Sequence, residues 1–316
     1  MNGKAFGMKG RKAGREARTR LGDMQRFKAD DGAELAFLDE GDGLPLLALA
    51  GLMTRDRRDF DYLARHLPGD VRLIRLDSRG RGGSQWTGAE TYNVPQEARD
   101  ALALLDHLGL ERAAIIGSSR GGLIAIVITA TQKQRLLGVC LNDVGPVLQR
   151  EGLLRIGEYI GVTPTAPTLA EIAGRMPTAM PGFANVPESR WAEETVRHFI
   201  QEDGRVSLPY DPALRVSFMT AMAGPLPDAW PLFEACEGLP LALIRGAASD
   251  VLSRETAGDM RRHSLDMLFA EAAGRGHIPF LDEPEALAAI AQWLDLVRVF
   301  STLNPAETAI SGEARA

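Results

Sequence analysis

The segment Gly117-Ser118-Ser119-Arg120-Gly121 carries residue types that could support nucleophilic catalysis. Apolar residues stand on both sides of it, so we expect a sharp turn from a strand into a helix. A nucleophile on such a turn needs small residues two positions before and two after it, because the backbone is crowded there. Glycines occupy both positions around Ser119, whereas Ile116 and Arg120 occupy them around Ser118. Ser119 is therefore the predicted nucleophile.

A serine hydroxyl is a weak nucleophile that needs a base, and the base needs an acid to orient it. His277 is the predicted base, because it falls in a loop between the last expected strand and the last expected helix. The other histidines fall in helical, inserted or charged segments. Asp250 is the predicted acid, because it follows the apolar run 239–246 in a loop of its own. In parallel sheets, loops at the strand ends are where functional side chains gather.

The elements that must position these side chains form an α/β pattern. From residue 25, short apolar runs alternate with segments of helical period, such as 58–67 and 95–110. Most runs are nearly continuous in Val, Ile, Leu and Ala, as expected for parallel strands covered on both faces. Asp31-Gly32 predicts a hairpin between the first two runs. We expect strands at 26–30, 33–41, 44–52, 70–78, 113–117, 136–143, 239–246 and 265–272.

The alternation stops between about residues 147 and 228, which read as helices joined by loops. A capping box from Thr168 to Glu171 marks the start of one of these helices. We expect this region to form a helical cap over the sheet edge. The core would then comprise residues 24–146 and 229–299, with a disordered basic tail at 1–23 and a loose tail at 300–316.

Composition limits the possible partners. The 316-residue chain has a formal net charge of −6, and the segment 1–23 holds seven Lys or Arg residues against two acids. The remainder is therefore strongly acidic, which disfavours nucleic acid as a partner. No apolar run approaches the ~20 residues of a membrane helix, so no membrane partner is expected. Two distant cysteines indicate no disulfide framework, and a cytoplasmic location is expected.

The sequence contains no motif that predicts a cofactor or a metal. There is no phosphate-binding loop, no dinucleotide-binding glycine pattern in context, and no metal-ligand spacing of His, Cys and Glu. We expect neither a cofactor nor a metal. The predicted partner is a small-molecule substrate, and the predicted assembly is a monomer or a homodimer.

Taken together and in order, several stretches resemble the α/β-hydrolase superfamily, and specifically its capped bacterial serine hydrolases of the esterase, enol-lactonase and C–C hydrolase types. The resemblance covers about residues 25–299. It implies a mostly parallel eight-stranded sheet with helices on both faces and a helical cap. It also implies a Ser119–His277–Asp250 triad, with an oxyanion hole formed by the backbone N–H groups of Leu52 and Arg120. The stretches that carry it are "LPLLALAGLMTRDRRDFDYLARHL", "LDSRGRGGS", "GSSRGG", "LNDVGP", "RGAASDVLS" and "GRGHIPFLDEPEAL".

The predicted function is hydrolysis of a small to medium, apolar carboxylic ester, lactone or thioester through an acyl-enzyme on Ser119. The same triad also serves C–C bond hydrolysis of diketones, acyl transfer and perhydrolysis. A ligand-binding receptor of weak catalytic activity is a further alternative. Candidate substrate-pocket residues are Met53, Tyr159, Trp191 and Ile278.

Two residues near the predicted triad have more than one interpretation. Asp143 follows the strand at 136–143, where some relatives place the catalytic acid, so its position alone does not exclude it. We favour Asp250 and expect Asp143 to pair with Arg120, which should emerge at the same sheet edge. The alternative for Arg120 is a clamp for a substrate carboxylate.

Overall fold

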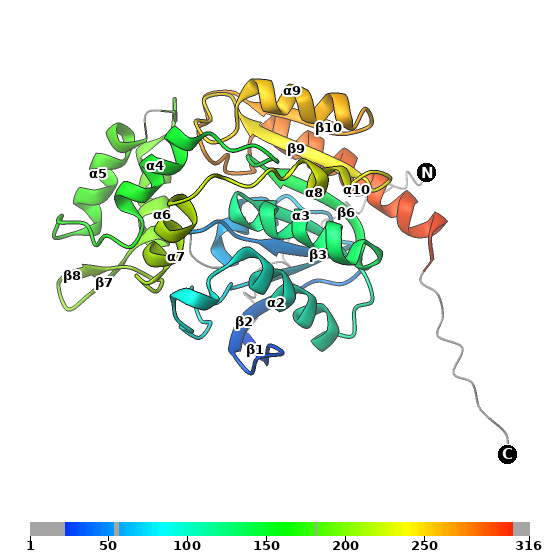
Figure 1. Ribbon diagram of the computed structural model, residues 1–316. Helices are drawn as coiled ribbons and strands as arrows, with labels where there is room; N and C mark the ends of the chain where they lie inside the picture. Colours follow the sequence, from blue (N-terminus) through cyan, green and yellow to red (C-terminus); the bar gives the residue numbers. More distant parts are fainter. Residues whose placement is uncertain (1–22, 54–56, 181, 306–316) are drawn as a thin grey trace, which may run out of the picture.

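The computed structural model describes residues 23–53, 57–180 and 182–305. Most of the predicted basic tail, part of the segment after Leu52 and the end of the predicted C-terminal tail therefore lie outside the described residues. Within the described part, all eight expected strands form one sheet (Figure 1). The strands are β1 Gln25–Lys28, β2 Glu34–Glu40, β3 Leu44–Leu49, β4 Val71–Leu76, β5 Ala113–Ser118, β6 Leu136–Asn142, β9 Leu241–Gly246 and β10 Leu268–Ala272.

The sheet is mostly parallel, in the order β1-β2-β4-β3-β5-β6-β9-β10. Antiparallel pairing is confined to β1 with β2 and β2 with β4. The other neighbours pair in parallel. The carboxyl ends of β3, β5, β6, β9 and β10 therefore meet at one edge, so that the loops after them can share one site.

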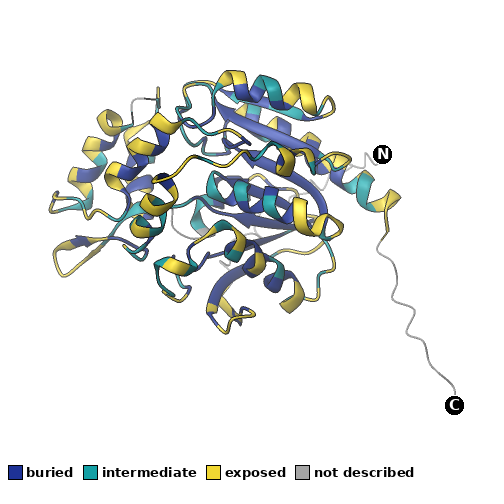
Figure 2. Cartoon of the chain, in the orientation of Figure 1, coloured by how far each residue is buried: buried dark blue, intermediate teal, exposed yellow. Residues whose placement is uncertain are grey.

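Helices cover both faces of the sheet, because the side chains of each strand alternate between two apolar clusters. In β3, Leu47 and Leu49 join the cluster with α2, α3, α8 and α9, whereas Leu46 and Ala48 join the cluster with α1 and α10. Figure 2 shows the resulting buried sheet between helices with exposed outer sides. The helices are α1 Asp61–Ala64, α2 Val94–His107, α3 Arg120–Gln132, α8 Trp230–Glu234, α9 Arg254–His263 and α10 Pro284–Leu303.

Helix α10 differs from expectation in two ways. It runs to Leu303, so the predicted tail from residue 300 begins inside a helix. It is also long and apolar enough to cross a membrane by length and composition alone, although the sequence suggested no such run. Its apolar side packs on the sheet, where Trp293 and Val297 are fully buried. Core packing therefore accounts for part of the apolar composition of α10, whereas Leu296, Val299 and Leu303 are exposed.

Residues between β6 and α8 leave the sheet and gather at one end of it (Figure 1). Thr168 accepts a hydrogen bond from the N–H of Glu171 and caps α5, as the capping-box pattern predicts. The two-stranded hairpin was not expected from the sequence, because its strands are only three residues each. The elements of this inserted region are α4 Arg150–Tyr159, α5 Leu169–Ala179, α6 Glu188–His198, β7 Ile200–Glu202, β8 Arg205–Ser207 and α7 Leu214–Met222.

Tyr62 of α1 joins the inserted region to the core. Its hydroxyl lies 2.9 Å from a carboxylate oxygen of Glu194, on α6. Its ring lies between the guanidinium groups of Arg190 and Arg197, at 3.7 and 3.8 Å from the ring centre. Arg190 also forms two hydrogen bonds with Asp282, in the loop before α10. These charge-assisted and cation–π contacts hold α6 over the sheet edge.

Candidate active site

Ser119 stands on a sharp turn between β5 and α3, as predicted. Its φ of 49° lies in the left-handed region, which is unfavourable for a residue with a side chain. A Cβ at residue 117 would lie 2.4 Å from the Gly121 backbone, and one at residue 121 would lie 1.9 Å from the Leu49 carbonyl oxygen. Both flanking positions therefore require glycine, and the turn presents Ser119 at the carboxyl edge of the sheet.

His277 connects Ser119 to an acid. Its Nε2 lies 2.8 Å from Ser119 Oγ, and its Nδ1 lies 2.8 Å from Asp143 Oδ2. With the proton on Nδ1, the ring donates a hydrogen bond to Asp143 and accepts one from the Ser119 hydroxyl. This is the arrangement of a serine nucleophile with its base and orienting acid.

The prediction that Asp250 orients the histidine is wrong. Asp143 follows β6 with a φ of 57°, and its side chain is completely buried. The loop after β9 supplies hydrogen-bond donors to Asp143: the N–H of Gly246 at 2.8 Å from Oδ1 and the Ser249 hydroxyl at 2.6 Å from Oδ2. Asp250 lies farther along this loop, and its carboxylate contacts Arg155 of α4 at 3.2 Å.

The prediction that Arg120 pairs with Asp143 is also wrong, because the Asp143 carboxylate accepts its hydrogen bond from His277. Arg120 instead forms two hydrogen bonds, of 2.8 and 2.9 Å, with the buried Glu97 of α2. Burial would raise the pKa of Glu97, but the charges of Arg120 and Arg81 bring it below its usual value. The charge that follows the nucleophile thus belongs to a structural pair beneath the site.

The residues predicted to form the oxyanion hole are Leu52, in the loop after β3, and Arg120, which follows Ser119 in the chain. Arg120 is the first residue of α3, where helix N–H groups have no partner within the helix. Among the described residues, neither N–H forms a hydrogen bond. The Leu52 carbonyl is held by Arg81 at 2.8 Å, which fixes the peptide after Leu52. Their role with a bound substrate remains a prediction.

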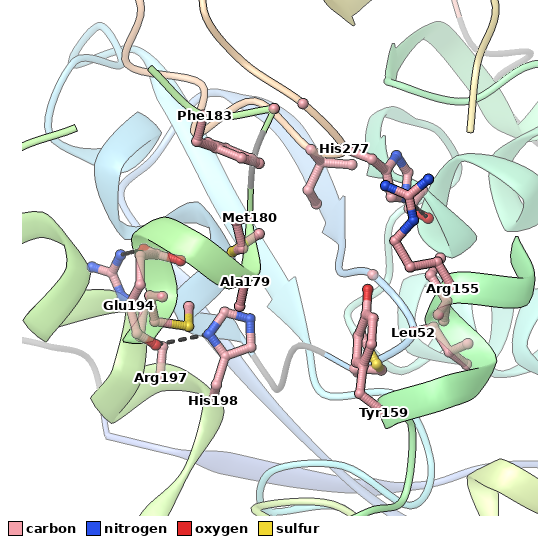
Figure 3. Close-up of a pocket in the computed structure, with 18 of the residues that line it drawn as sticks. Leu52, Arg155, Tyr159, Ala179, Met180, Phe183, Glu194, Arg197, His198 and His277 are labelled. Carbon is pink, nitrogen blue, oxygen red and sulfur yellow. Dashed lines mark hydrogen bonds and ion pairs between the residues drawn. The ribbon is translucent and has the colours of Figure 1, made fainter. Parts of the chain in front are cut away.

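A pocket of about 670 Å³ opens over Ser119 and His277, between the sheet edge and the inserted helices (Figure 3). The four residues predicted to form the substrate pocket, Met53, Tyr159, Trp191 and Ile278, all line it. The pocket also has charged residues that were not predicted from the sequence, including Arg155, Arg175 and Arg197. These residues lie on amphipathic helices, where a charge normally indicates a solvated surface.

Among the residues that the structure describes, no group of three or more His, Cys, Asp or Glu side chains could hold a metal ion. Ser119, His277 and Asn142 all line the pocket.

Comparison with known proteins identifies the family. Residues 46–290 match the alpha/beta hydrolase family. The chain is 33% identical to a 3-hydroxybutyrate-oligomer hydrolase from Cupriavidus necator, over 88% of this chain and 98% of that protein. It is 24% identical to the esterase YbfF of Escherichia coli, over 74% of this chain and 86% of the esterase.

A solved structure agrees with these relatives. The crystal structure of an alpha/beta hydrolase from Novosphingobium aromaticivorans has a TM-score of 0.82 and 34% identity, covering 88% of this chain and 99% of that one. The chain belongs to the alpha/beta hydrolase family and is a hydrolase.

Proposed function

We propose that this hydrolase is a serine carboxylester hydrolase that forms an acyl-enzyme on Ser119. The observation that carries the proposal is the hydrogen-bonded chain Ser119–His277–Asp143 beneath a pocket of about 670 Å³. The pocket suits a small to medium acyl chain, because apolar side chains such as Met176, Phe183 and Trp191 form much of its lining.

In the acylation step, Ser119 Oγ forms a bond with the carbonyl carbon while its proton passes to His277 Nε2. Asp143 keeps the Nδ1–H in place and stabilises the charged ring. The oxyanion accepts hydrogen bonds from the Leu52 and Arg120 N–H groups. The C–O bond then breaks, and the leaving alcohol takes the proton from His277. Water repeats the sequence on the acyl-enzyme, releasing the acid and restoring Ser119.

The relative from Cupriavidus necator favours a more specific candidate within this class. Its name describes hydrolysis of 3-hydroxybutyrate oligomers, and the similarity extends over nearly its whole length. We propose oligomeric or simple esters of short hydroxy acids as the substrates to test first. Lactones, thioesters, diketones, and acyl transfer or perhydrolysis assays belong in the same panel, because the same triad can serve all of them.

Labelling by a fluorophosphonate probe tests the serine mechanism directly. The probe is expected to modify Ser119 stoichiometrically, because only an activated hydroxyl attacks the phosphorus centre. Mass spectrometry of the peptide that contains residues 118 and 119 locates the adduct. Heat-denatured protein is the control and should remain unlabelled. An intact, folded protein that resists the probe would contradict the proposed function.

Ser249 is expected to act as a positioning residue through Asp143. Its hydroxyl donates to Asp143 Oδ2, the same oxygen that accepts from His277. Ser249→Ala should lower kcat about tenfold, the effect of one hydrogen bond to a charged group, and leave KM unchanged. Ser249→Thr keeps the hydroxyl and should restore kcat. Steady-state kinetics on ethyl butyrate check this, and an equal loss in both variants would indicate a packing role.

A further inference from the structure

Two polar side chains of α4 reach into the pocket without a strong partner. Arg155 and Tyr159 are four residues apart and so share one face of the helix. Both line the pocket that contains Ser119 and His277. Figure 3 shows them projecting from the same helix, on the side of the pocket where His277 lies. Tyr159 remains 49% exposed.

Arg155 has one polar contact, which joins α4 of the inserted region to Asp250 in the loop after β9. Its Nη1 lies 3.2 Å from Asp250 Oδ2, and no other ion pair or hydrogen bond involves the Arg155 side chain in the described part of the chain. The two side chains remain 51% and 34% exposed, respectively, so neither is enclosed by protein. Guanidinium donors and a carboxylate oxygen therefore stay available to a ligand in the pocket.

The chemistry of this pair narrows the choice of ligand. The charges of Arg155 and Asp250 cancel, and Glu158 also lines the pocket. The other two arginines of the lining, Arg175 and Arg197, pair with Glu171 and Glu194. A substrate carboxylate bound beside Arg155 would therefore meet two acidic side chains. A purely apolar chain packed against the pair would remove water from both groups and give nothing in return. A hydroxyl group can satisfy both members of the pair, because it accepts a hydrogen bond from Arg155 and donates one to Asp250.

Tyr159 can take part in the same recognition. Partial burial of its ring, in a residue that is 49% exposed, and the neighbouring Asp250 carboxylate raise the pKa of Tyr159 above its usual value. Its hydroxyl therefore stays protonated at neutral pH and offers both a donor and an acceptor to a ligand.

We propose that Arg155 and Asp250 form a subsite that binds the hydroxyl group of a hydroxyacyl ester and selects such esters over plain acyl esters. The proposal rests on the proposed ester hydrolase function. In this proposal Asp250, which is not the acid of the triad, binds substrate instead. The preceding residue, Ser249, contacts the triad acid Asp143.

The test compares esters that share the same leaving alcohol. Ethyl butyrate, the two enantiomers of ethyl 3-hydroxybutyrate, and monoethyl succinate are hydrolysed by the wild type, Arg155→Met and Asp250→Asn, and kcat/KM is measured by titration of the released acid. The wild type is expected to prefer one hydroxybutyrate enantiomer over butyrate by about 10- to 100-fold, the effect of hydrogen bonds to charged groups. Arg155→Met should bring this ratio close to one, and Asp250→Asn, whose amide oxygen is a weaker acceptor than a carboxylate, should lower the ratio.

Arg175→Met is the matched control. Arg175 also lines the pocket but faces Glu171 of its own helix at 3.6 Å, so its loss should preserve the hydroxybutyrate-to-butyrate ratio. Melting temperatures of all variants show that the fold is intact. Equal wild-type rates on hydroxybutyrate and butyrate, or a preference that survives Arg155→Met, would overturn the subsite. So would a preference for monoethyl succinate that disappears in Arg155→Met, because it would indicate a carboxylate site.

A binding measurement separates the subsite from catalysis. Calorimetry with Ser119→Ala should give a Kd for ethyl 3-hydroxybutyrate about 10- to 100-fold below that for ethyl butyrate, and Arg155→Met in the same background should remove the difference. A wild type that hydrolyses no ester while this binding difference is present refutes the proposed function alone. Hydrolysis of both esters without a binding difference refutes the subsite alone.

Discussion

Ser119→Ala is expected to lower the kcat of ester hydrolysis by about 10⁴-fold or more while the protein stays folded. The substitution removes the only hydroxyl that lies within hydrogen-bond distance of His277 in the described residues. The turn itself does not depend on this hydroxyl, since its shape is set by the glycines at 117 and 121. Single-turnover and steady-state rates on ethyl butyrate, together with the melting temperature, measure the effect.

Ser118→Ala is the matched control for this substitution. Ser118 is buried, and its hydroxyl accepts a hydrogen bond from the Asn142 side-chain amide at 3.0 Å rather than contacting His277. The same amide also donates to the carbonyl of Pro279, so it keeps one partner when Ser118 is replaced. Most of the activity should survive. If the two variants lost the same fraction of kcat, the assignment of Ser119 as the nucleophile would fail.

The nucleophile and the base could be predicted from the sequence because each has a local signature. Ser119 is recognisable by the glycines that its crowded turn requires, and His277 by its place between the last strand and the last helix. The fold could also be predicted from the sequence, because the alternation of apolar runs with helical segments is long and regular. The structure was needed to choose between residues only where two candidates satisfied the same local pattern.

The acid of the triad was such a case. Asp143 and Asp250 both follow strands whose carboxyl ends lie at the same sheet edge, one on each of two neighbouring strands. Position along the chain therefore could not separate them. The deciding factor is local backbone geometry: the left-handed φ of Asp143, and the Gly246 and Ser249 donors that hold its carboxylate. Neither is encoded in a short motif.

The partner of Arg120 could not be found from the sequence for a related reason. Glu97 lies in the first turn of α2, where an acidic residue is also expected simply from the helix dipole. Its burial beneath Arg120 and Arg81 depends on how α2 and α3 pack against each other, which is a contact between distant segments. The charged residues of the pocket were missed in the same way, because only the fold turns Arg155 of α4, Arg175 of α5 and Arg197 of α6 toward the pocket.

Asp143→Asn is expected to lower kcat by about 10³- to 10⁴-fold, with the fold and the binding of substrate largely preserved. An amide at this position can still accept the N–H of Gly246 through its oxygen, so the buried end of β6 keeps that partner. Toward His277, however, an NH₂ group would replace the carboxylate oxygen that accepts the Nδ1 proton. The ring would then favour the tautomer with its proton on Nε2, and this nitrogen could no longer accept the proton of Ser119.

Asp250→Asn provides the comparison that decides between the two acids. The Asp250 carboxylate contacts Arg155 rather than His277, so this variant should stay within about tenfold of the wild type on ethyl butyrate, an ester without a hydroxyl for the subsite to bind. Kinetics and thermal melting of both variants complete the measurement. An inactive Asp250→Asn variant together with an active Asp143→Asn variant would show that Asp250, in the loop after β9, is the acid of the triad. It would also mean that the hydrogen bond between Asp143 and His277 gives way to another arrangement when substrate is bound.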